Sequence, residues 1–361
     1  MVAIDRNLEQ QTKETEISAV CQSCDGFCPV TVKVKDDRVV KVTPRQTPLL
    51  KDVICMKGVY APKSLAHPNR FMHPLRRIGA RGDGQWEQIT WEQALDDIAE
   101  QMTETVKKYG PEAVAVSMSG ANIGTDNGLA RRFLNHLGSP NWISGVAYCF
   151  GNTAAVNRMV YGWFPQSDIL NSKCIALWGH DPRRHSWTME YKAIRMAQAR
   201  GAKLIVLDPR QSGNADAADL WIPLRSVTDT AMAFGWLNVI IEEKLYDEDF
   251  VKDWTIGFDA LAERVREFPL QRVSEITGVD AELIAKAARL YATSETATLP
   301  WTPITDQQHS STSAIRLQCA LRSITGNLDI KGGDNFVGFN PAVRSDTEIE
   351  MHDILPDQQK A

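Results

Sequence analysis

Apolar and polar residues alternate at positions 31–42, on both sides of Asp36 and Asp37. Such alternation is typical of strands with one buried face, and aspartates are common turn residues, so the segment predicts a β-hairpin. Residues 1–17 are charged and show no apolar periodicity, and we expect them to be a frayed leader. A small sheet is therefore predicted near the N-terminus.

A helical pattern occupies residues 90–110. Thr90 and Gln93 have the spacing of a capping box, and Gly110 followed by Pro111 is a typical helix stop. Four apolar side chains recur at helical spacing on one face of this segment: Leu95, Ile98, Met102 and Val106. The segment therefore predicts an amphipathic helix.

Strand and helix patterns alternate through the rest of the chain. Residues 113–118 predict a buried strand, and residues 127–138 predict a helix. Further helices are expected at 228–244, 280–293 and 312–325. This alternation is typical of α/β proteins.

The clearest unit runs from residue 174 to residue 208. A strand, a polar loop, a helix and a second strand follow one another there, at 174–179, 180–185, 191–201 and 203–208. This order predicts a parallel βαβ unit of the nucleotide-binding kind. The segment lacks G-x-G-x-x-G, so an ordinary NAD site is not supported. The predicted fold class is α/β, with Rossmann-like dinucleotide-binding lobes and a small N-terminal β domain.

Composition narrows the possible partners. The 361 residues carry a net charge of −5, which gives no basic field for nucleic acid or anionic lipid, so small molecules are the favoured partners. The sequence shows no apolar run long enough for a membrane span, and its first residues show no apolar signal segment. We therefore expect a cytoplasmic protein.

Four of the seven cysteines cluster toward the N-terminus. Cys21, Cys24 and Cys28 have the spacing C-x2-C-x3-C, and Cys55 follows inside "ICMKG". Three ligands from one loop and a fourth standing alone are typical of a 4Fe-4S cluster, whereas zinc ribbons present two separate C-x2-C pairs. Structural zinc and reduced core thiols are the alternatives.

These motifs resemble those of a known family, the molybdopterin oxidoreductases of the dimethyl sulfoxide reductase superfamily. The resemblance covers nearly the whole chain and rests on "CMKG", "WEQALDDIAE", "VLDPR", "ADLWIPLRSVTD" and "TGNLDIKGG". Within the superfamily, "CQSCD", "LGSPNW" and "CFGNTAAVNR" are most similar to the acetylene hydratase branch. The resemblance implies a 4Fe-4S cluster and a molybdenum or tungsten ion held by two molybdopterin guanine dinucleotides.

The resemblance also implies roles for single residues. Lys57 would lie between the cluster and one pterin, where it would assist electron passage; the alternative is a surface lysine. Cys149 matches the position that supplies a thiolate to the metal, and the alternative is a core cysteine. Cys174 and Cys319 lie in apolar patterns and are expected to be small core residues.

Dinucleotides bind at the carboxyl ends of parallel strands, where loops and helix N-termini face the phosphates. Two such strand ends carry the candidate residues Gly179, His180 and Asp181, then Asp208, Pro209 and Arg210. By resemblance, Asp229 matches a guanine-contacting aspartate in a Gly-Thr-Asp triplet, although Val227 replaces the glycine, which puts the loop backbone in doubt. A helix N-cap is the alternative role for both Asp208 and Asp229.

Asp25 directly follows the second cysteine of the cluster motif. The plain interpretation is a loop residue that caps backbone amides. The resemblance implies a carboxyl group that lies over a metal-bound water and acts in its protonated form, because burial raises its pKa. Where the hydratases have a ring of isoleucines, this chain has Gly26, Ala121 and Phe150, and it retains Trp187, so the substrate pocket is expected to differ in shape.

Two enzymatic functions follow from the resemblance: two-electron redox conversion of a small substrate, with electrons relayed through the cluster to a partner protein, or non-redox hydration of a small unsaturated substrate. Catalytic chains of this family are much longer, so we expect a truncated architecture. A fragment, a chain completed by a second chain, or a cluster-binding electron-transfer or assembly module would fit. The expected parts are an iron-sulfur domain at 1–63, the first part of a discontinuous α/β domain at 64–140, a dinucleotide-binding domain at 141–310 and an incomplete returning segment at 311–361.

Overall fold

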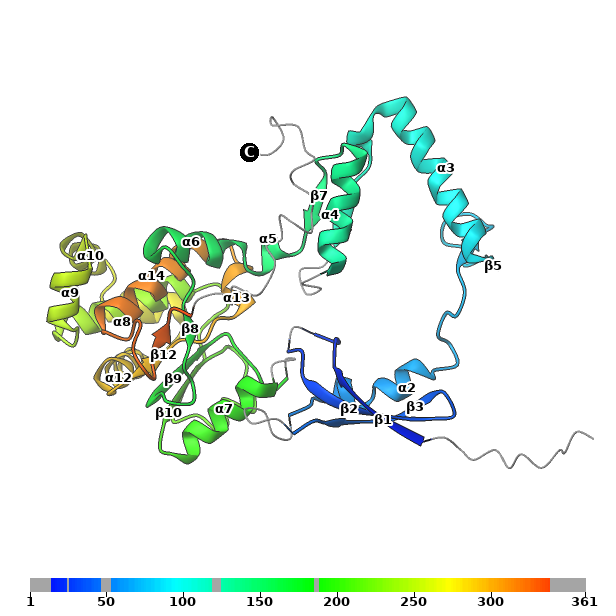
Figure 1. Ribbon diagram of the computed structural model, residues 1–361. Helices are drawn as coiled ribbons and strands as arrows, with labels where there is room; N and C mark the ends of the chain where they lie inside the picture. The colour runs from blue at the N-terminus through cyan, green and yellow to red at the C-terminus, as the bar shows by residue number, and fades with distance from the viewer. Residues whose placement is uncertain (1–13, 25, 47–52, 119–124, 185–187, 338–361) are drawn as a thin grey trace, which may run out of the picture. The chain divides into compact units, whose positions relative to one another are not determined.

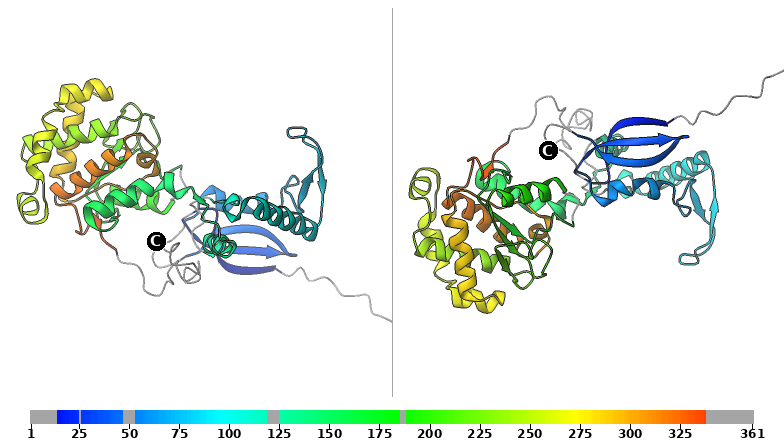
Figure 2. Two further views of the ribbon diagram at one scale, coloured as in Figure 1. Left: turned by 90° about the horizontal axis from the view of Figure 1, so that it is seen from above. Right: turned by 90° about the horizontal axis from the view of Figure 1, so that it is seen from below.

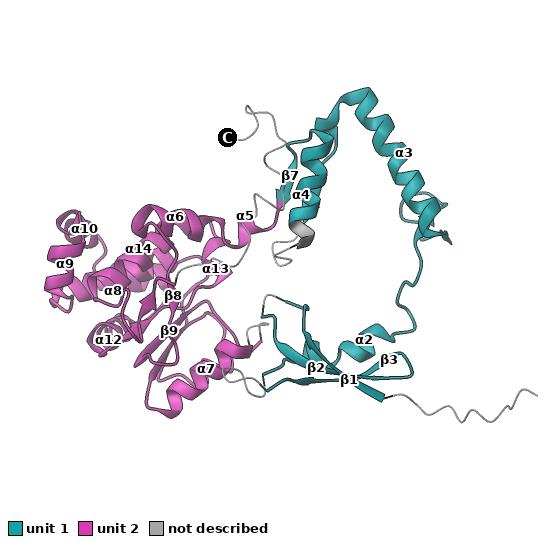
Figure 3. Ribbon diagram, viewed as in Figure 1, with its two compact units in different colours: residues 1–143, 344–361 teal, residues 144–343 magenta. Residues whose placement is uncertain are grey.

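The computed structural model describes residues 14–24, 26–46, 53–118, 125–184 and 188–337 (Figure 1). They belong to two compact units, Met1–Ile143 with Arg344–Ala361, and Ser144–Val343 (Figure 3). The first unit holds a small N-terminal sheet and the second a parallel sheet flanked by helices, so the predicted mixed α/β class is confirmed. The finer division into four parts stays a prediction.

The N-terminal sheet has the order β1-β2-β3 and is antiparallel, with β1 Glu14–Val20, β2 Pro29–Lys35 and β3 Arg38–Pro44. The predicted hairpin is confirmed: Asp36 and Asp37 connect β2 to β3 with φ of 51° and 59°, the left-handed conformation of a tight hairpin turn. The prediction of a leader over residues 1–17 is wrong from Glu14 onward. Residues from Glu14 onward form β1, whose backbone is paired with β2. Glu14 also forms an ion pair with Lys33 of β2.

The rest of the first unit contains two longer helices, α3 and α4, and several short elements. These are α1 Met56–Val59, α2 Ala61–Leu65, β4 Leu75–Arg77, β5 Trp86–Gln88, α3 Trp91–Tyr109, the 3-10 turn Pro111–Ala113, β6 Val116–Met118, α4 Thr125–Leu137 and β7 Trp142–Ser144. The capping box of α3 is present: the Gln93 amide donates to Thr90 Oγ1 at 3.2 Å, and the Thr90 amide donates to Gln93 Oε1 at 2.9 Å. The predicted helix at 127–138 is confirmed as α4.

One expectation for the first unit needs correction. The strand predicted at 113–118 begins only at Val116, because the Pro111–Ala113 turn takes the preceding residues, and its side chains are half-buried or exposed rather than buried. The apolar face of α3 is largely uncovered, with Leu95 60% exposed and Ile98 54% exposed. No described residue of α3 is buried. This helix therefore presents apolar surface that its own unit does not cover.

The second unit is built on a four-stranded sheet with the order β11-β10-β9-β12, in which every pairing is parallel. The strands are β9 Cys174–Trp178, β10 Lys203–Leu207, β11 Leu220–Ile222 and β12 Ala297–Thr298. α7, Thr188–Ala199, connects β9 to β10, so the predicted βαβ unit is confirmed. A two-stranded pair, β8 Gln166–Ser167 with β13 Asp334–Asn335, completes the strands described in this unit.

Both faces of the parallel sheet are covered, as parallel sheets require. Ile175 and Leu177 of β9 pack with Ile194 of α7 on one face. Ala176 and Trp178 point to the other face and join the larger core with side chains of α8, α12 and α14. In both views of Figure 2, the yellow-green and yellow helices gather at one end of this unit.

The remaining helices are α5 Val146–Cys149, α6 Gly151–Tyr161, α8 Asp229–Glu242, α9 Glu248–Trp254, α10 Phe258–Val265, α11 Leu270–Thr277, α12 Ala281–Thr293, α13 Pro303–Asp306 and α14 Ser311–Ile324.

The predictions for the second unit are largely confirmed. The helices expected at 228–244, 280–293 and 312–325 are α8, α12 and α14. Cys174 and Cys319 are fully buried, as expected of core residues, and burial raises the pKa of the Cys174 thiol to about 12. In the part of the chain that the structure describes, no helix combines the length and the apolar character needed to cross a membrane. The cytoplasmic location stays a prediction.

Candidate cofactor sites

The cysteine loop connects β1 to β2 and is closed by backbone hydrogen bonds. The Cys21 amide donates to the Cys28 carbonyl at 2.9 Å, which extends the β1–β2 ladder by one pair. The Gly26 amide donates to Cys24 Sγ at 3.4 Å, so the loop backbone turns toward the sulfur. Phe27 has a φ of 39°, a conformation that few non-glycine residues adopt. The hairpin thus folds a three-cysteine segment into one tight loop.

Cys55 reaches this loop from the start of α1. Gly58 of α1 lies against the same loop: a Cβ at this position would lie 3.5 Å from Cys21 Sγ and 2.8 Å from the Ile54 side chain. Burial raises the pKa of Cys28, and the neighbouring Cys24, Cys21 and Cys55 raise it further. The four sulfurs are therefore close enough to interact electrostatically. Gly58 belongs to the sequence motif "ICMKG", but the sequence alone did not predict this contact.

The donor set fits a cluster better than a single ion. Soft thiolates bind both zinc and iron-sulfur clusters, but zinc needs its ligands at about 2.3 Å from one point, whereas each cluster thiolate binds a different iron. Three of the thiols come from one loop and the fourth from the start of α1, as in cluster-binding motifs. Lys57 is exposed on α1. Asp25 lies outside the described residues.

The second group of candidates lies at the carboxyl edge of the parallel sheet. β10 and β12 flank β9 on opposite sides, so the end of β9 is the topological switch point where α/β sheets bind ligands. Gly179 follows β9 with a φ of 62°, and a Cβ there would lie 3.2 Å from Ile304. Thr302 Oγ1 donates to the Gly179 carbonyl at 3.1 Å. A segment after β12, which the sequence did not indicate, therefore borders the site.

His180 and Asp181 are buried directly after Gly179 and are held by polar partners. His180 Nε2 lies 2.8 Å from Glu190 Oε1 on α7. Asp181 accepts from Asn214 Nδ2 at 2.7 Å and from Arg210 Nη2 at 3.0 Å. The structure thus joins the loops that follow β9 and β10, as the prediction requires. Neither Glu190 nor Asn214 was singled out, because each acts only through a residue distant in sequence.

The loop after β10 carries Asp208, Pro209 and Arg210. The Asp208 carboxylate accepts the Arg210 amide at 2.8 Å, and no helix begins there, so its alternative role as a helix N-cap is wrong. The Asp208 carbonyl accepts from Trp221 Nε1 at 2.8 Å, which ties the loop to β11. Pro209 and Arg210 are exposed at the sheet edge. The guanidinium of Arg210 therefore neutralises Asp181 and also faces solvent.

Asp229 begins α8 under the same sheet. Trp178 Nε1 donates to Asp229 Oδ1 at 2.7 Å, and burial raises the pKa of this carboxyl group despite that hydrogen bond. Thr228, not Asp229, is the N-cap residue, so the alternative role of Asp229 is wrong. Val227 has a φ of 68°. The loop therefore keeps a left-handed backbone that favours glycine, although the glycine of the family triplet is absent.

Cys149 ends α5, and Phe150 separates it from α6. We call the segment Cys149–Gly151 the cysteine junction. Cys149 is half-buried. The Phe150 ring contacts Phe164 and Trp301 edge-on, with ring centroids 5.0 Å and 5.1 Å apart. Ala121 and Trp187, the other predicted pocket residues, lie outside the described residues.

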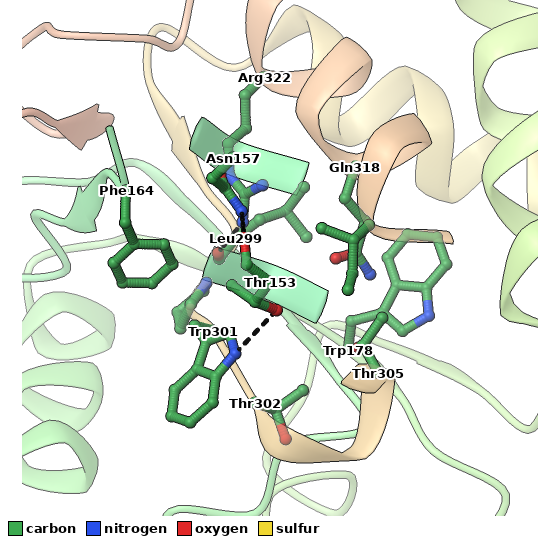
Figure 4. A pocket seen from close by; sticks show the side chains of 12 residues that line it. Thr153, Asn157, Phe164, Trp178, Leu299, Trp301, Thr302, Thr305, Gln318 and Arg322 are labelled. Carbon is green, nitrogen blue, oxygen red and sulfur yellow. Dashed lines mark hydrogen bonds between the residues drawn. The ribbon is translucent and has the colours of Figure 1, made fainter. Parts of the chain in front are cut away.

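A small cavity of about 10 Å³ lies beside α6 (Figure 4). Its polar lining includes Thr153 and Asn157 of α6, Trp301 and Thr302 after β12, Thr305 of α13, and Gln318 and Arg322 of α14. This volume holds about one water molecule. Arg322 is buried in an ion pair with Asp334 at 2.9 Å, so its charge is compensated. The cavity is too small for an organic substrate.

Comparison with known proteins identifies the class. The chain matches the family model "Molybdopterin oxidoreductase" over residues 47–355 and "Molybdopterin oxidoreductase Fe4S4 domain" over residues 14–67. It therefore belongs to the molybdopterin oxidoreductase family. This confirms the predicted family and, at the level of the cofactors, a 4Fe-4S cluster and a molybdopterin cofactor. Which residues hold them stays a prediction.

Individual relatives agree with the family. The chain is 43% identical to acetylene hydratase of Syntrophotalea acetylenica, over 94% of this chain and 47% of that protein. The solved structure of acetylene hydratase from Pelobacter acetylenicus matches with a TM-score of 0.84 and 42% identity, covering 95% of this chain and 48% of that one. Dimethyl sulfoxide reductase DmsA of Escherichia coli is 29% identical, over 92% of this chain and 46% of its own length. The chain spans about half the length of these relatives.

Proposed function

We propose that this chain binds the cofactors of a molybdenum- or tungsten-dependent enzyme that converts a small substrate in a two-electron redox reaction. The observation that carries the proposal is the joining of loops from β9, β10 and β12 around one sheet edge, in a chain that also gathers four thiols. Arg210 and Thr302 contribute to this joining through Asp181 and the Gly179 carbonyl. When bound, the metal and its pterins supply redox or Lewis-acid chemistry.

The residues divide between two sites. Four thiolates would hold the 4Fe-4S cluster: Cys21, Cys24, Cys28 and Cys55. Cys149 would supply a thiolate to the metal, and Lys57 would assist electron passage from the cluster. The dinucleotides would be bound by the loop residues Gly179, His180, Asp181, Asp208, Pro209 and Arg210, together with Asp229. The guanidinium of Arg210 suits a phosphate, and the carboxylate of Asp229 suits the N–H groups of a guanine.

Hydration of a small unsaturated molecule is the second candidate function. The observation that favours it is the 43% identity to acetylene hydratase, which exceeds the identity to DmsA. In this case Asp25 would be the acid that positions and protonates the substrate. Phe150 is fixed edge-on by Phe164 and Trp301, so a large aromatic ring stands where the hydratases have an isoleucine. The substrate would then differ from acetylene.

We further propose that additional polypeptide completes the catalytic unit. The exposed apolar side chains of α3, such as Leu95 and Ile98, support this proposal, because an uncovered apolar helix face marks a site of association. One relative, thiosulfate reductase PhsA of Salmonella typhimurium, is by name a molybdopterin-containing subunit. An electron-transfer partner for the redox function belongs to the same proposal.

Elemental analysis of anaerobically purified protein tests the cofactor assignment. About four irons per chain with about one molybdenum or tungsten are expected when both sites are filled. Zinc in place of iron would contradict the cluster. Cys149→Ser is expected to change the spectrum of the metal while iron content stays constant, and an unchanged spectrum would remove Cys149 as a ligand.

Activity assays separate the two functions. Redox turnover with an artificial electron acceptor or donor, and hydration of small alkynes and nitriles, are measured on the same preparation. Asp25→Asn is expected to abolish hydration and to leave iron content unchanged. Hydration that survives this substitution would exclude Asp25 as the acid, and redox turnover without hydration would reject the second candidate.

A further inference from the structure

We propose that Asp306 is a positioning residue that fixes the cysteine junction, and with it the Cys149 thiolate, relative to the carboxyl edge of the parallel sheet. The proposal rests on the proposed function, because it assigns a purpose to a fixed Cys149. Asp306 ends α13, more than 150 residues after the junction in sequence. It was not among the residues predicted from the sequence.

The Asp306 carboxylate is bonded to the first turn of α6. This side chain is only 3% exposed. Its Oδ1 accepts the Thr153 amide at 2.8 Å, and its Oδ2 accepts the Thr153 hydroxyl at 2.6 Å. Its backbone carbonyl accepts from Asn152 Nδ2 at 3.2 Å. Two successive residues of α6 are therefore attached to one residue of α13.

These bonds supply what α6 lacks. The first amides of a helix have no acceptor within the helix, and an N-cap side chain usually provides one. Phe150 occupies the N-cap position of α6 and has no side-chain acceptor. Asp306 provides the acceptor from a distant segment and places a negative charge at the positive end of the helix. The helix that begins two residues after Cys149 is thus capped by α13.

A second connection runs through aromatic rings. Trp301 Nε1 donates to Asp306 Oδ2 at 3.2 Å and to Thr153 Oγ1 at 3.1 Å, and the latter bond is drawn in Figure 4. The Trp301 ring in turn meets the Phe150 ring edge-on at 5.1 Å. Asp306 is therefore connected to both sides of the cysteine junction. Through Trp301 it supports Phe150, which directly follows Cys149, and through Thr153 it binds the first turn of α6.

The same segment is attached to the dinucleotide edge. Thr302 lies between Trp301 and α13, and its hydroxyl donates to the Gly179 carbonyl at the end of β9. Residues 301–306 thus connect the cysteine junction to the strand end that the proposed function assigns to a dinucleotide. A thiolate that binds a metal held by dinucleotides must keep its place relative to them, and this connection provides that constraint.

The test uses the full chain without bound cofactors and compares wild type with Asp306→Asn. An amide side chain offers one acceptor oxygen where the carboxylate offers two, so one of the converging donors loses its partner. The alkylation rate of Cys149 by iodoacetamide, resolved by peptide mass spectrometry, is expected to rise about fivefold, as is amide exchange in the first turn of α6. A Cys149 rate equal to that of wild type would overturn the proposal.

Two further variants separate positioning from general instability. Val273→Ala removes a fully buried side chain from the core of the second unit, away from the junction, and is expected to leave the Cys149 rate unchanged. Trp301→Phe keeps the ring contact and removes the donor, so a smaller rise is expected, and this variant decides the question if Asp306→Asn does not fold. An equal rise in Val273→Ala would overturn the proposal.

Measurements on metal-loaded protein distinguish this inference from the proposed function. Asp306→Asn is expected to shift the electron paramagnetic resonance signal and the midpoint potential of the metal while iron content stays constant. If Cys149→Ser leaves that signal unchanged, the ligand assignment fails, and the alkylation rates still judge whether Asp306 fixes the junction. If Cys149→Ser changes the signal and Asp306→Asn does not, the positioning role is overturned.

Discussion

Two residues near the carboxyl edge of the parallel sheet have features that cost stability. Val227 is β-branched, 53% exposed and has a φ of 68°, so it bears backbone strain and gains little from packing. Two positions further on, Asp229 is a buried carboxyl group with a raised pKa. Both features lower the stability of the loop, and both agree with the proposed binding role of this sheet edge.

Replacing Val227 by glycine is expected to stabilise the second unit. The left-handed conformation costs an L-residue about 1–2 kcal/mol, and glycine loses about 0.5–1 kcal/mol more chain entropy on folding. The unfolding free energy of Val227→Gly should therefore rise by about 0.5–1 kcal/mol, measured by urea denaturation. Val227→Ala keeps the strain of a Cβ and should show little change. A loss of stability in Val227→Gly would show that the valine side chain makes a contact worth more than the strain.

Asp229→Asn is expected to change the pH dependence of stability. Because the folded pKa of Asp229 lies above its ordinary value of 3.8, the folded state binds the proton more tightly than the unfolded state. Stability is therefore lost as pH rises from about 3.8 through the folded pKa, and it stays lost at neutral pH. The asparagine cannot ionise and can still accept the Trp178 hydrogen bond. Its stability relative to wild type should thus be greater at pH 7 than at pH 3.5.

Asp219 provides the control of opposite sign. Burial raises the pKa of this carboxyl group, but the hydrogen bond from Lys203 and backbone amides outweigh it, so the pKa is lowered. Its stabilising contribution is present above pH 3.8 and lost below. Asp219→Asn should therefore be less stable than wild type at pH 7, with a smaller difference at pH 3.5. Equal pH profiles for the two variants would contradict both assignments.

At the scale of elements, the sequence predicted the helices and strands whose boundaries are marked by local sequence patterns. The capping box and the helix stop define α3, and the apolar strands on both sides of a helical pattern define the unit from β9 to β10. α6, α13 and β12 were not predicted, because they are stabilised by contacts across the chain. Asp306 caps α6 from outside, and β12 pairs over only two residues with β9. Local periodicity carries no trace of such contacts.

The packing of α1 against the cysteine loop leads to a prediction for cluster binding. In Gly58→Ala the new Cβ would lie 2.8 Å from the Ile54 side chain, so Ile54 or α1 must move. Overpacking of this kind costs about 1–3 kcal/mol, and a shift of α1 would move Cys55, its N-cap residue, relative to the cysteine loop. Iron content per chain should fall, measured by inductively coupled plasma mass spectrometry after anaerobic purification. The double variant Gly58→Ala with Ile54→Ala should regain iron. If it does not, the contact with Ile54 is not the cause of the iron loss.

At the scale of the whole molecule, the two sites are built on different principles. The sequence supplied candidate residues for both, because cysteine spacing and strand ends are local features. It could not identify Thr302, Glu190 or Asn214, since these reach the sheet edge only after the strands have paired. The described part of the first unit buries few apolar side chains: Cys28, Val30, Val42, Val53 and Leu134. The second unit contains all three hydrophobic clusters among the described residues.

This contrast predicts that the two units respond differently to loss of iron. The core of the second unit and its buried ion pair between Arg322 and Asp334 lie entirely within residues 144–343, so this segment expressed alone should unfold cooperatively. The first unit has little core, and the free energy of cluster binding must contribute to its folding, as in small metal-binding domains. Calorimetry of the full chain should therefore show one transition that disappears when iron is chelated. A second transition should keep the melting temperature of segment 144–343. A segment that fails to fold alone, or a second transition that shifts on chelation, would show that the stability of each unit depends on the other.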